Sequence, residues 1–178
     1  MILCLDACAL YPVALREMLI AYAKAGGFTP VWSARAAEEW ARAAGAKQGE
    51  AAEMLARGDA ARMRAAFPDG EIDAAGDFEA GFGGPDPADA HVVAAALAGG
   101  AEAILTFNLK DFPPRALRPL GLVALHPDAF LAGALKRDPM RLRAALAEME
   151  RAAGERGMRA FLKRAGLPRF GRAWEIGS

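Results

Sequence analysis

The sequence contains few of the residues that cross-link small secreted proteins or bind soft metals. Its 178 residues include only two cysteines, Cys4 and Cys8, and two histidines, His91 and His126. Two cysteines are too few for a disulfide framework. A Cys-x₃-Cys zinc site would need further ligands, which so few histidines hardly provide. Because Cys4 lies between leucines in an apolar run, we interpret it as a small core residue.

Long apolar stretches and a net charge are absent as well. No apolar run approaches the roughly 20 residues of a membrane span, so we expect a soluble, cytoplasmic protein that does not enter the membrane. The net charge is zero, which argues against a uniformly basic nucleic-acid binder. Residues 136–178 nevertheless carry 11 Lys and Arg against 5 Asp and Glu. This basic tail is interpreted either as a solvated helical face or as a surface that steers phosphate.

What the sequence does contain is an alternation of apolar runs and helix signals. The apolar runs are continuous, which is typical of strands buried on both faces of a parallel sheet. They predict strands at residues 2–5, 28–32, 103–107 and 122–125. The helix signals predict helices at residues 13–25, 34–44 and 90–97, and further helices that start at residues 128 and 138. Residues 47–66 are predicted to form one or two helices with a break near Gly58. Residues 67–85 are predicted to be mostly loop.

Several residues mark the predicted helix ends. Pairs of glycines at Gly26 and at Gly99 predict two C-termini. Ser33 is the expected N-cap of the helix after the second strand. Asp86, which is followed by a proline, is the expected N-cap of the helix that ends before Gly99. Strands that alternate with helices imply an α/β fold with a mainly parallel sheet.

Polar residues follow the predicted strands, or open the helices next to them, in a recurring order. Six of them have this placement: Asp6, Glu38, Glu39, Asp89, Asn108 and Asp111. In open parallel sheets, functional groups gather beyond the carboxyl ends of the strands. Oxygen ligands from separate elements suit Mg²⁺ and Mn²⁺, and such ions drive phosphodiester hydrolysis. The pattern therefore predicts a divalent metal centre.

Each acid also has a purely structural interpretation. A carboxylate directly after a core strand is costly unless it is paired or metal-bound, which favours Asp6 as a ligand over Asp6 as a helix cap. Asp86 is interpreted as a cap. Asp89 lies on the apolar stripe of Val92, so we interpret it as a ligand. His91 points elsewhere on the helix and is interpreted as a hydrogen-bonded structural histidine rather than a general base.

Taken in order, these motifs resemble the PIN domain family of metal-dependent ribonucleases, which includes the VapC-type toxins of bacterial toxin–antitoxin pairs. The resemblance spans about residues 2–130 and lies in four segments: Leu5-Asp6-Ala-Cys-Ala-Leu10, Val31-Trp-Ser33 with Glu38-Glu39-Trp40, Asp86-Pro-Ala-Asp89-Ala-His91, and Leu105-Thr-Phe-Asn108-Leu-Lys-Asp111-Phe-Pro113. The tail around Leu167-Pro-Arg-Phe170 looks like the helical extension of a subset of the family.

The resemblance implies a three-layer α/β/α PIN-like domain over residues 1–130 and a helical C-terminal extension over residues 131–178. In such proteins acids gather around one or two Mg²⁺ or Mn²⁺ ions, and metal-activated water attacks the phosphate. The residues carried over as the catalytic set are Asp6, Glu39, Asp89 and Asn108. The metal ligands carried over are Asp6, Glu39 and Asp89, with Asn108 or Asp111 completing the shell.

Two departures from the family pattern stand out. The last acid is often Asp, but here it is Asn108, whose carbonyl adds no charge and which could be only a turn residue. Asp111, three residues later, would compensate. The glutamate is doubled, and we prefer Glu39 because it directly precedes the apolar Trp40, while Glu38 stays open.

The resemblance further implies an endoribonuclease toxin of a type II toxin–antitoxin system, with RNA as substrate and an antitoxin protein as partner. A homodimer is one of the assemblies that the resemblance allows. An alternative, favoured by Asn108, is a PIN-like module that binds RNA or protein with weakened or lost catalysis. A third is a phosphatase with Asp6 as nucleophile, but such enzymes generally carry a second acid where Cys8 stands. No glycine-rich phosphate loop supports nucleotide binding.

Overall fold

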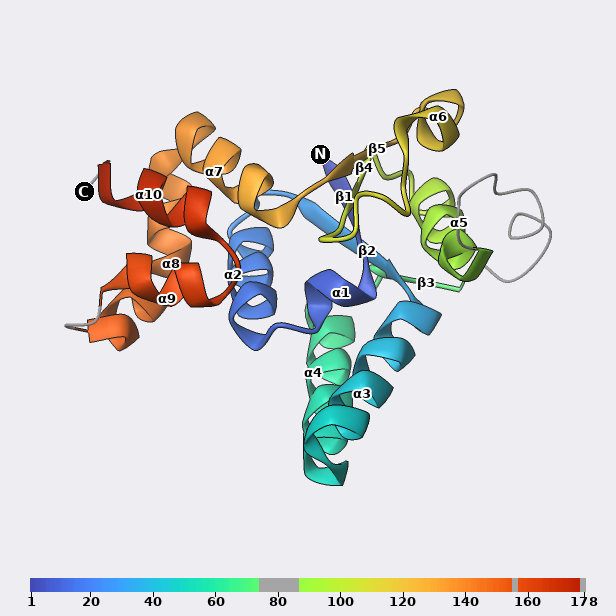
Figure 1. The fold of residues 1–178 in the computed structure, drawn as a ribbon, viewed down its shortest axis with the longest axis horizontal. Coiled ribbons are helices and arrows are strands. Elements are labelled where there is room, and N and C mark those ends of the chain that lie inside the picture. The colour runs from blue at the N-terminus through green and yellow to red at the C-terminus, as the bar shows by residue number, and fades with distance from the viewer. Residues whose placement is uncertain (74–86, 155–156, 177–178) are drawn as a thin grey trace. The chain divides into compact units, whose positions relative to one another are not determined.

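The computed structural model describes residues 1–73, 87–154 and 157–176 (Figure 1). The chain divides into two compact units. The first contains Met1–Tyr11 and Phe28–Leu125, and the second contains Pro12–Gly27 and His126–Ser178. Strands occur in the first unit, whereas the described part of the second is helical.

The first unit is built on a five-stranded parallel sheet with the order β3-β2-β1-β4-β5. The strands are β1 (Ile2–Leu5), β2 (Thr29–Ser33), β3 (Glu71–Ile72), β4 (Ala103–Leu105) and β5 (Val123–Leu125). In the central strand, Cys4 lies opposite Val31 on one side and Ile104 on the other. The four predicted strands are confirmed, and β3 is an addition in a segment predicted to be mostly loop.

The core of this unit lies between the sheet and α5 (Ala90–Ala98), which contacts β1, β2 and β4. Val93, Ile104 and Cys4 are fully buried there. The Cys4 thiol donates to the carbonyl oxygen of Val92 at 3.5 Å. Burial, together with the negative charge of Asp6, raises the pKa of Cys4 well above its usual range. The interpretation of Cys4 as a core residue is therefore confirmed.

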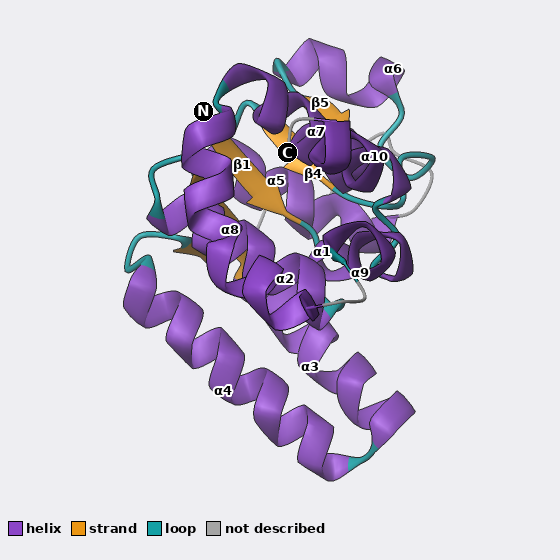
Figure 2. Cartoon of the chain, turned by 90° about the vertical axis from the view of Figure 1, so that its left-hand side faces the viewer, coloured by secondary structure: helices purple, strands orange, loops and turns teal. Residues whose placement is uncertain are grey.

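Two long helices, α3 (Ala34–Gln48) and α4 (Glu50–Ala66), pack side by side (Figure 2). Ser33 is the N-cap of α3, as predicted, and its Oγ accepts from the Ala36 amide at 2.9 Å. The predicted break near Gly58 is wrong, because α4 is continuous. A glycine inside a helix costs only about 1 kcal/mol relative to alanine, and burial of Ala56 and Ala60 on this helix offsets it.

Short elements complete the first unit. They are α1 (Ala7–Leu10), the 3₁₀ helices η2 (Pro87–Asp89) and η3 (Arg118–Leu120), and α6 (Pro114–Leu117). Helix α5 ends at Gly99, as predicted, and Gly100 follows at a φ of +64°, which glycine adopts without strain. The predicted cap Asp86 lies outside the described residues.

The second unit consists of α2 (Val13–Lys24), α7 (Pro127–Arg137), α8 (Pro139–Ala153), α9 (Met158–Arg164) and α10 (Pro168–Ile176). The helix predicted to start at residue 138 is confirmed as α8, and Asp138 is its N-cap, accepting from the Arg141 amide at 3.1 Å. Helix α7 begins at Pro127 with His126 as its N-cap, one residue before the predicted start at Asp128. The rings of Phe170 and Trp174 meet edge to face in this unit, 5.6 Å apart.

The parallel sheet and its helices confirm the predicted three-layer α/β/α class with a helical C-terminal segment. Helix α2 contacts α8 and belongs to the second unit, so the helices of the tail associate with an early segment of the chain. Among the described helices, none combines the length and the hydrophobicity needed to cross a bilayer.

Candidate active site

The order of the strands creates a switch point next to β1. From β1 the chain passes to β2 and β3 on one side, and later to β4 and β5 on the other. Ligands of open parallel sheets bind at such a point, beyond the carboxyl ends of the strands. Asp6 follows β1 here, and its amide donates to the carbonyl oxygen of Leu105 at 3.2 Å. Asp6 and Thr106 therefore leave the sheet side by side.

The Asp6 carboxylate is buried and held by neutral donors. Its Oδ2 accepts from the hydroxyl of Thr106 at 2.7 Å and from the thiol of Cys8 at 2.9 Å. Burial raises the pKa of Cys8 to about 12, helped by the charge of Asp6, so the thiol keeps its proton to donate. Asp6 precedes α1, but its side chain makes no capping hydrogen bond, so the interpretation as a side-chain cap is wrong. Both bonds go to Oδ2, and Oδ1 is the oxygen that could bind a cation.

The loop after β4 extends this network to two further predicted residues. The backbone amide of Asn108 donates to Oγ1 of Thr106 at 2.9 Å, and the Thr106 hydroxyl in turn donates to Asp6. The side-chain amide of Asn108 donates to the Asp111 carboxylate. Thr106, which is fully buried, thus joins Asp6 to the Asn108–Asp111 pair. We call these four residues the β1/β4 group.

The two adjacent glutamates of α3 have different surroundings. Glu38 accepts from both terminal guanidinium nitrogens of Arg57 on α4, at 2.7 and 2.9 Å, and also pairs with Arg42. The hydrogen bonds from Arg57 are the main reason that the pKa of Glu38 is lowered to about 2. Glu39 instead faces α5, with its Oε2 at 3.4 Å from Nε2 of His91. Glu38 is thus committed to joining α3 and α4, which supports the choice of Glu39.

His91 is buried and connects β2, α3 and α5. Its Nδ1 lies 2.7 Å from Oγ of Ser33. Because that oxygen already accepts from a backbone amide, we assign the hydroxyl proton to His91 Nδ1. Nε2 then carries the ring proton and points it at Glu39. The prediction of a hydrogen-bonded structural histidine is confirmed, and we call Ser33, His91 and Glu39 the α3/α5 group.

Glu39 receives a second partner from its own helix. Arg35 Nε lies 2.9 Å from Oε1, in an ion pair whose members are both partly exposed. Burial alone would raise the pKa of Glu39, but the hydrogen bonds from His91 and Arg35, together with the positive charge of Arg35, outweigh it, so this pKa lies below its ordinary value. Glu39 is therefore held ionised, as a metal ligand must be.

Asp89 is half-buried at the last position of η2, directly before α5 and two residues before His91. It stands at the N-cap position of α5, but its side chain makes no capping hydrogen bond there. The role of Asp89 as a metal ligand stays a prediction.

The described residues do not form a ready-made metal cluster. Across residues 1–73, 87–154 and 157–176, no three His, Cys, Asp or Glu side chains are placed to hold one ion together. The structure joins Asp6, Asn108 and Asp111 in the β1/β4 group and places Glu39 in the α3/α5 group. The complete ligand set of Asp6, Glu39, Asp89 and Asp111 stays a prediction. Its donors are all oxygens, which fits a hard divalent cation.

Sequence reasoning missed the two side chains that hold Asp6. Thr106 and Cys8 stand in the quoted motifs, but only their positions relative to Asp6 in space reveal the contact. A hydroxyl residue at the end of a continuous apolar run is the signal that could have identified Thr106, because a buried hydroxyl needs a partner.

Comparison with known proteins gives two matches. A family model described as "PIN domain" matches residues 3–110, which is more than half of the chain and includes Asp6, Glu39, Asp89 and Asn108. A stretch of 43 residues is 58% identical to "Putative ribonuclease VapC50" from Mycobacterium tuberculosis. That stretch is 24% of this chain and 25% of the relative, so the chain spans only a quarter of the curated relative it matches. No solved structure matches the chain.

Proposed function

This chain belongs to the PIN domain family, and we propose that it is a divalent-metal-dependent endoribonuclease and the toxin of a type II toxin–antitoxin pair. The matching stretch of a relative named as a ribonuclease supports this proposal. The observation that carries it is the Asp6 carboxylate. It is buried at the switch point of the sheet, with neutral donors on one oxygen and the other oxygen available to a cation.

Asp6, Glu39 and Asp89 would hold one or two Mg²⁺ or Mn²⁺ ions, with Asn108 or Asp111 completing the shell. When bound, such ions activate water and offset the charge that develops on the phosphate. Glu39 would have to exchange Arg35 for the ion. That exchange costs little, because ion pairs between partly exposed side chains contribute weakly to stability.

The remaining residues of the two groups would orient these ligands. Thr106 and Cys8 fix Oδ2 of Asp6, which sets the direction of Oδ1. His91, itself fixed by Ser33, holds the Glu39 carboxylate on the side of α3 that faces α5. Such outer partners fix the orientation of metal ligands in many sites. RNA is the proposed substrate, and a small antitoxin protein that covers the acids is the proposed partner.

A second candidate function is a PIN-like module that binds RNA or protein without efficient catalysis. Asn108 favours it, because this amide adds no negative charge and its nitrogen is bonded to the neighbouring carboxylate of Asp111. Such a module would bind Mn²⁺ weakly or not at all.

The test is cleavage of a structured RNA pool with Mn²⁺ or with EDTA, by wild type and by Asp6→Asn and Asp89→Asn. We expect cleavage by wild type with Mn²⁺ alone, and its loss in both variants, whose folding is checked by circular dichroism. No cleavage by wild type, together with no Mn²⁺ uptake in calorimetry, would refute the enzyme and favour the binding module.

A further inference from the structure

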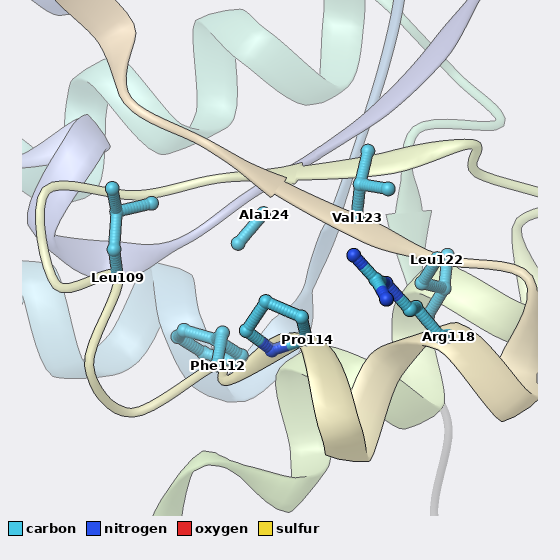
Figure 3. Close-up of a pocket in the computed structure, with 7 residues that line it drawn as sticks. All are labelled: Leu109, Phe112, Pro114, Arg118, Leu122, Val123 and Ala124. Carbon is cyan, nitrogen blue, oxygen red and sulfur yellow. The ribbon is translucent and has the colours of Figure 1, made fainter.

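An apolar groove of about 350 Å³ lies between β5, the loop after β4, and the helical segment of α6 and η3 (Figure 3). Two of the large apolar side chains that line it are unusually exposed, Val123 at 50% and Leu109 at 42%. Exposed apolar side chains that share one hollow mark contact sites more often than scattered ones do. The groove is distinct from the β1/β4 group, although the same loop carries Leu109 and Asn108.

The groove borders the edge of the sheet that is formed by β5. β5 is the last strand in the order, and its Leu125 carbonyl accepts from the Thr106 amide next to β4, at 3.0 Å. Since successive residues of a strand turn their backbone groups to opposite sides, Ala124, which lines the groove, directs its N–H and C=O to the edge that no other described strand pairs with. An extended chain can bond to such an edge.

The surroundings of the groove are positively charged. Lys110, Arg115 and Arg118 are exposed, and none of them has an acidic partner among the residues that the structure describes. Asp111 is the one acid between residues 103 and 125, and it is bonded to Asn108. The Arg118 side chain lies along the groove toward Val123 (Figure 3). A ligand that complements this surface is apolar and negatively charged.

We propose that the groove binds an extended segment of a partner protein that alternates apolar and acidic residues. The apolar side chains contact Leu109 and Val123, an acid pairs with Arg118, and the backbone bonds to Ala124. Single-stranded RNA fits less well, because RNA recognition relies on stacking of bases on exposed aromatic rings. The one aromatic ring in the lining, Phe112, is 1% exposed and offers no face for stacking.

The experiment measures fluorescence anisotropy of a labelled peptide, Asp-Val-Glu-Leu-Asp-Val-Glu-Leu, titrated with the full chain in EDTA. We expect saturable binding, which Val123→Lys and Arg118→Glu each weaken about tenfold, as loss of an important interface residue does. A peptide with lysine in place of every acid, and one with N-methylated central residues, should both fail to bind. Met54→Lys is the matched control, because Met54 is also an exposed apolar residue, 67% exposed, on α4.

Three results would overturn the proposal. The first is the absence of saturable binding, or binding that Val123→Lys and Arg118→Glu leave unchanged. The second is that a U-rich RNA oligonucleotide binds instead of the peptide, and that Val123→Lys abolishes this RNA binding. The third is a dimer in sedimentation that Val123→Lys dissociates, since the occupant would then be a second copy. The readout needs no catalysis, so failure of the nuclease proposal would leave this test intact.

Discussion

Two aspartates are buried among the described residues, one in each unit, and their partners differ. Asp128 in α7 accepts from the backbone amide of Phe170 on Oδ1 at 2.7 Å and from that of Arg169 on Oδ2 at 3.0 Å. Asp6 accepts only on Oδ2, from a hydroxyl and a thiol. Asp128 therefore uses both oxygens to cap the first turn of α10, whereas Asp6 uses one.

The difference shows that burial alone does not identify a functional carboxylate. A buried carboxylate needs partners in either case, because an unpaired buried charge is unfavourable. The two aspartates differ in whether a carboxylate oxygen remains without a hydrogen-bond donor. A helix end occupies Asp128 fully, while the neutral donors of Asp6 leave an oxygen for a cation.

The largest effect should follow from Asp6→Asn, which keeps the shape of the side chain but removes its charge. RNA cleavage should fall by more than about 100-fold, because even the outer partners of metal ligands are worth about 10- to 100-fold. The melting temperature should change little. Asp128→Asn is the control, and its cleavage rate per folded molecule should equal that of wild type. Comparable losses of cleavage in the two variants would contradict the assignment of a catalytic role to Asp6 and a structural role to Asp128.

Asp128→Ala should produce the next largest effect, this time on stability. It leaves the first-turn amides of Arg169 and Phe170 without their acceptor, which should cost about 2 kcal/mol of the free energy of unfolding. Urea denaturation measures this. Asp138→Ala, which removes an exposed cap from α8, should cost less. An Asp128 variant as stable as wild type would show that the cap is replaceable by water.

Glu39→Gln and Glu38→Gln sharpen the same comparison on one helix. Glu39→Gln should lower both Mn²⁺ affinity in calorimetry and RNA cleavage by at least about tenfold, which is the lower bound even for the outer partners of metal ligands. Glu38→Gln should leave both readouts unchanged, because Arg57 and Arg42 occupy its carboxylate. The reverse result would assign the ligand to Glu38.

The smallest effect concerns the pH dependence of the Glu38–Arg57 pair. The pKa of Glu38 is lowered to about 2 in the folded protein, so this group stabilises the fold above its unfolded pKa and loses that contribution as the pH falls toward 2. Wild type should therefore denature at a higher temperature than Glu38→Gln at about pH 6, by less than the Asp128→Ala effect. The difference should vanish near pH 2. A difference that persists there would mean that packing, not charge, is the cause.

Much of the fold could be predicted because its signals are local. Continuous apolar runs marked four strands, and Ser33 and Asp138 marked two helix starts by their side-chain chemistry. The break near Gly58 was predicted wrongly, because a local helix penalty was outweighed by packing of α4 on α3. The strand β3 was missed because two residues carry no periodicity and are defined only by pairing with β2.

The sequence by itself determined the parallel α/β class, the family, and the order in which candidate acids follow the strands. These features depend on the hydrophobicity and residue types of each segment, which are local properties of the sequence. Only the tertiary structure decided that Thr106 and Cys8 hold Asp6, and that Arg57 occupies Glu38 while His91 faces Glu39. It also decided that Asp128 caps a helix about forty residues later. Contacts between distant residues depend on how elements pack, and no local pattern encodes which donor will meet which carboxylate.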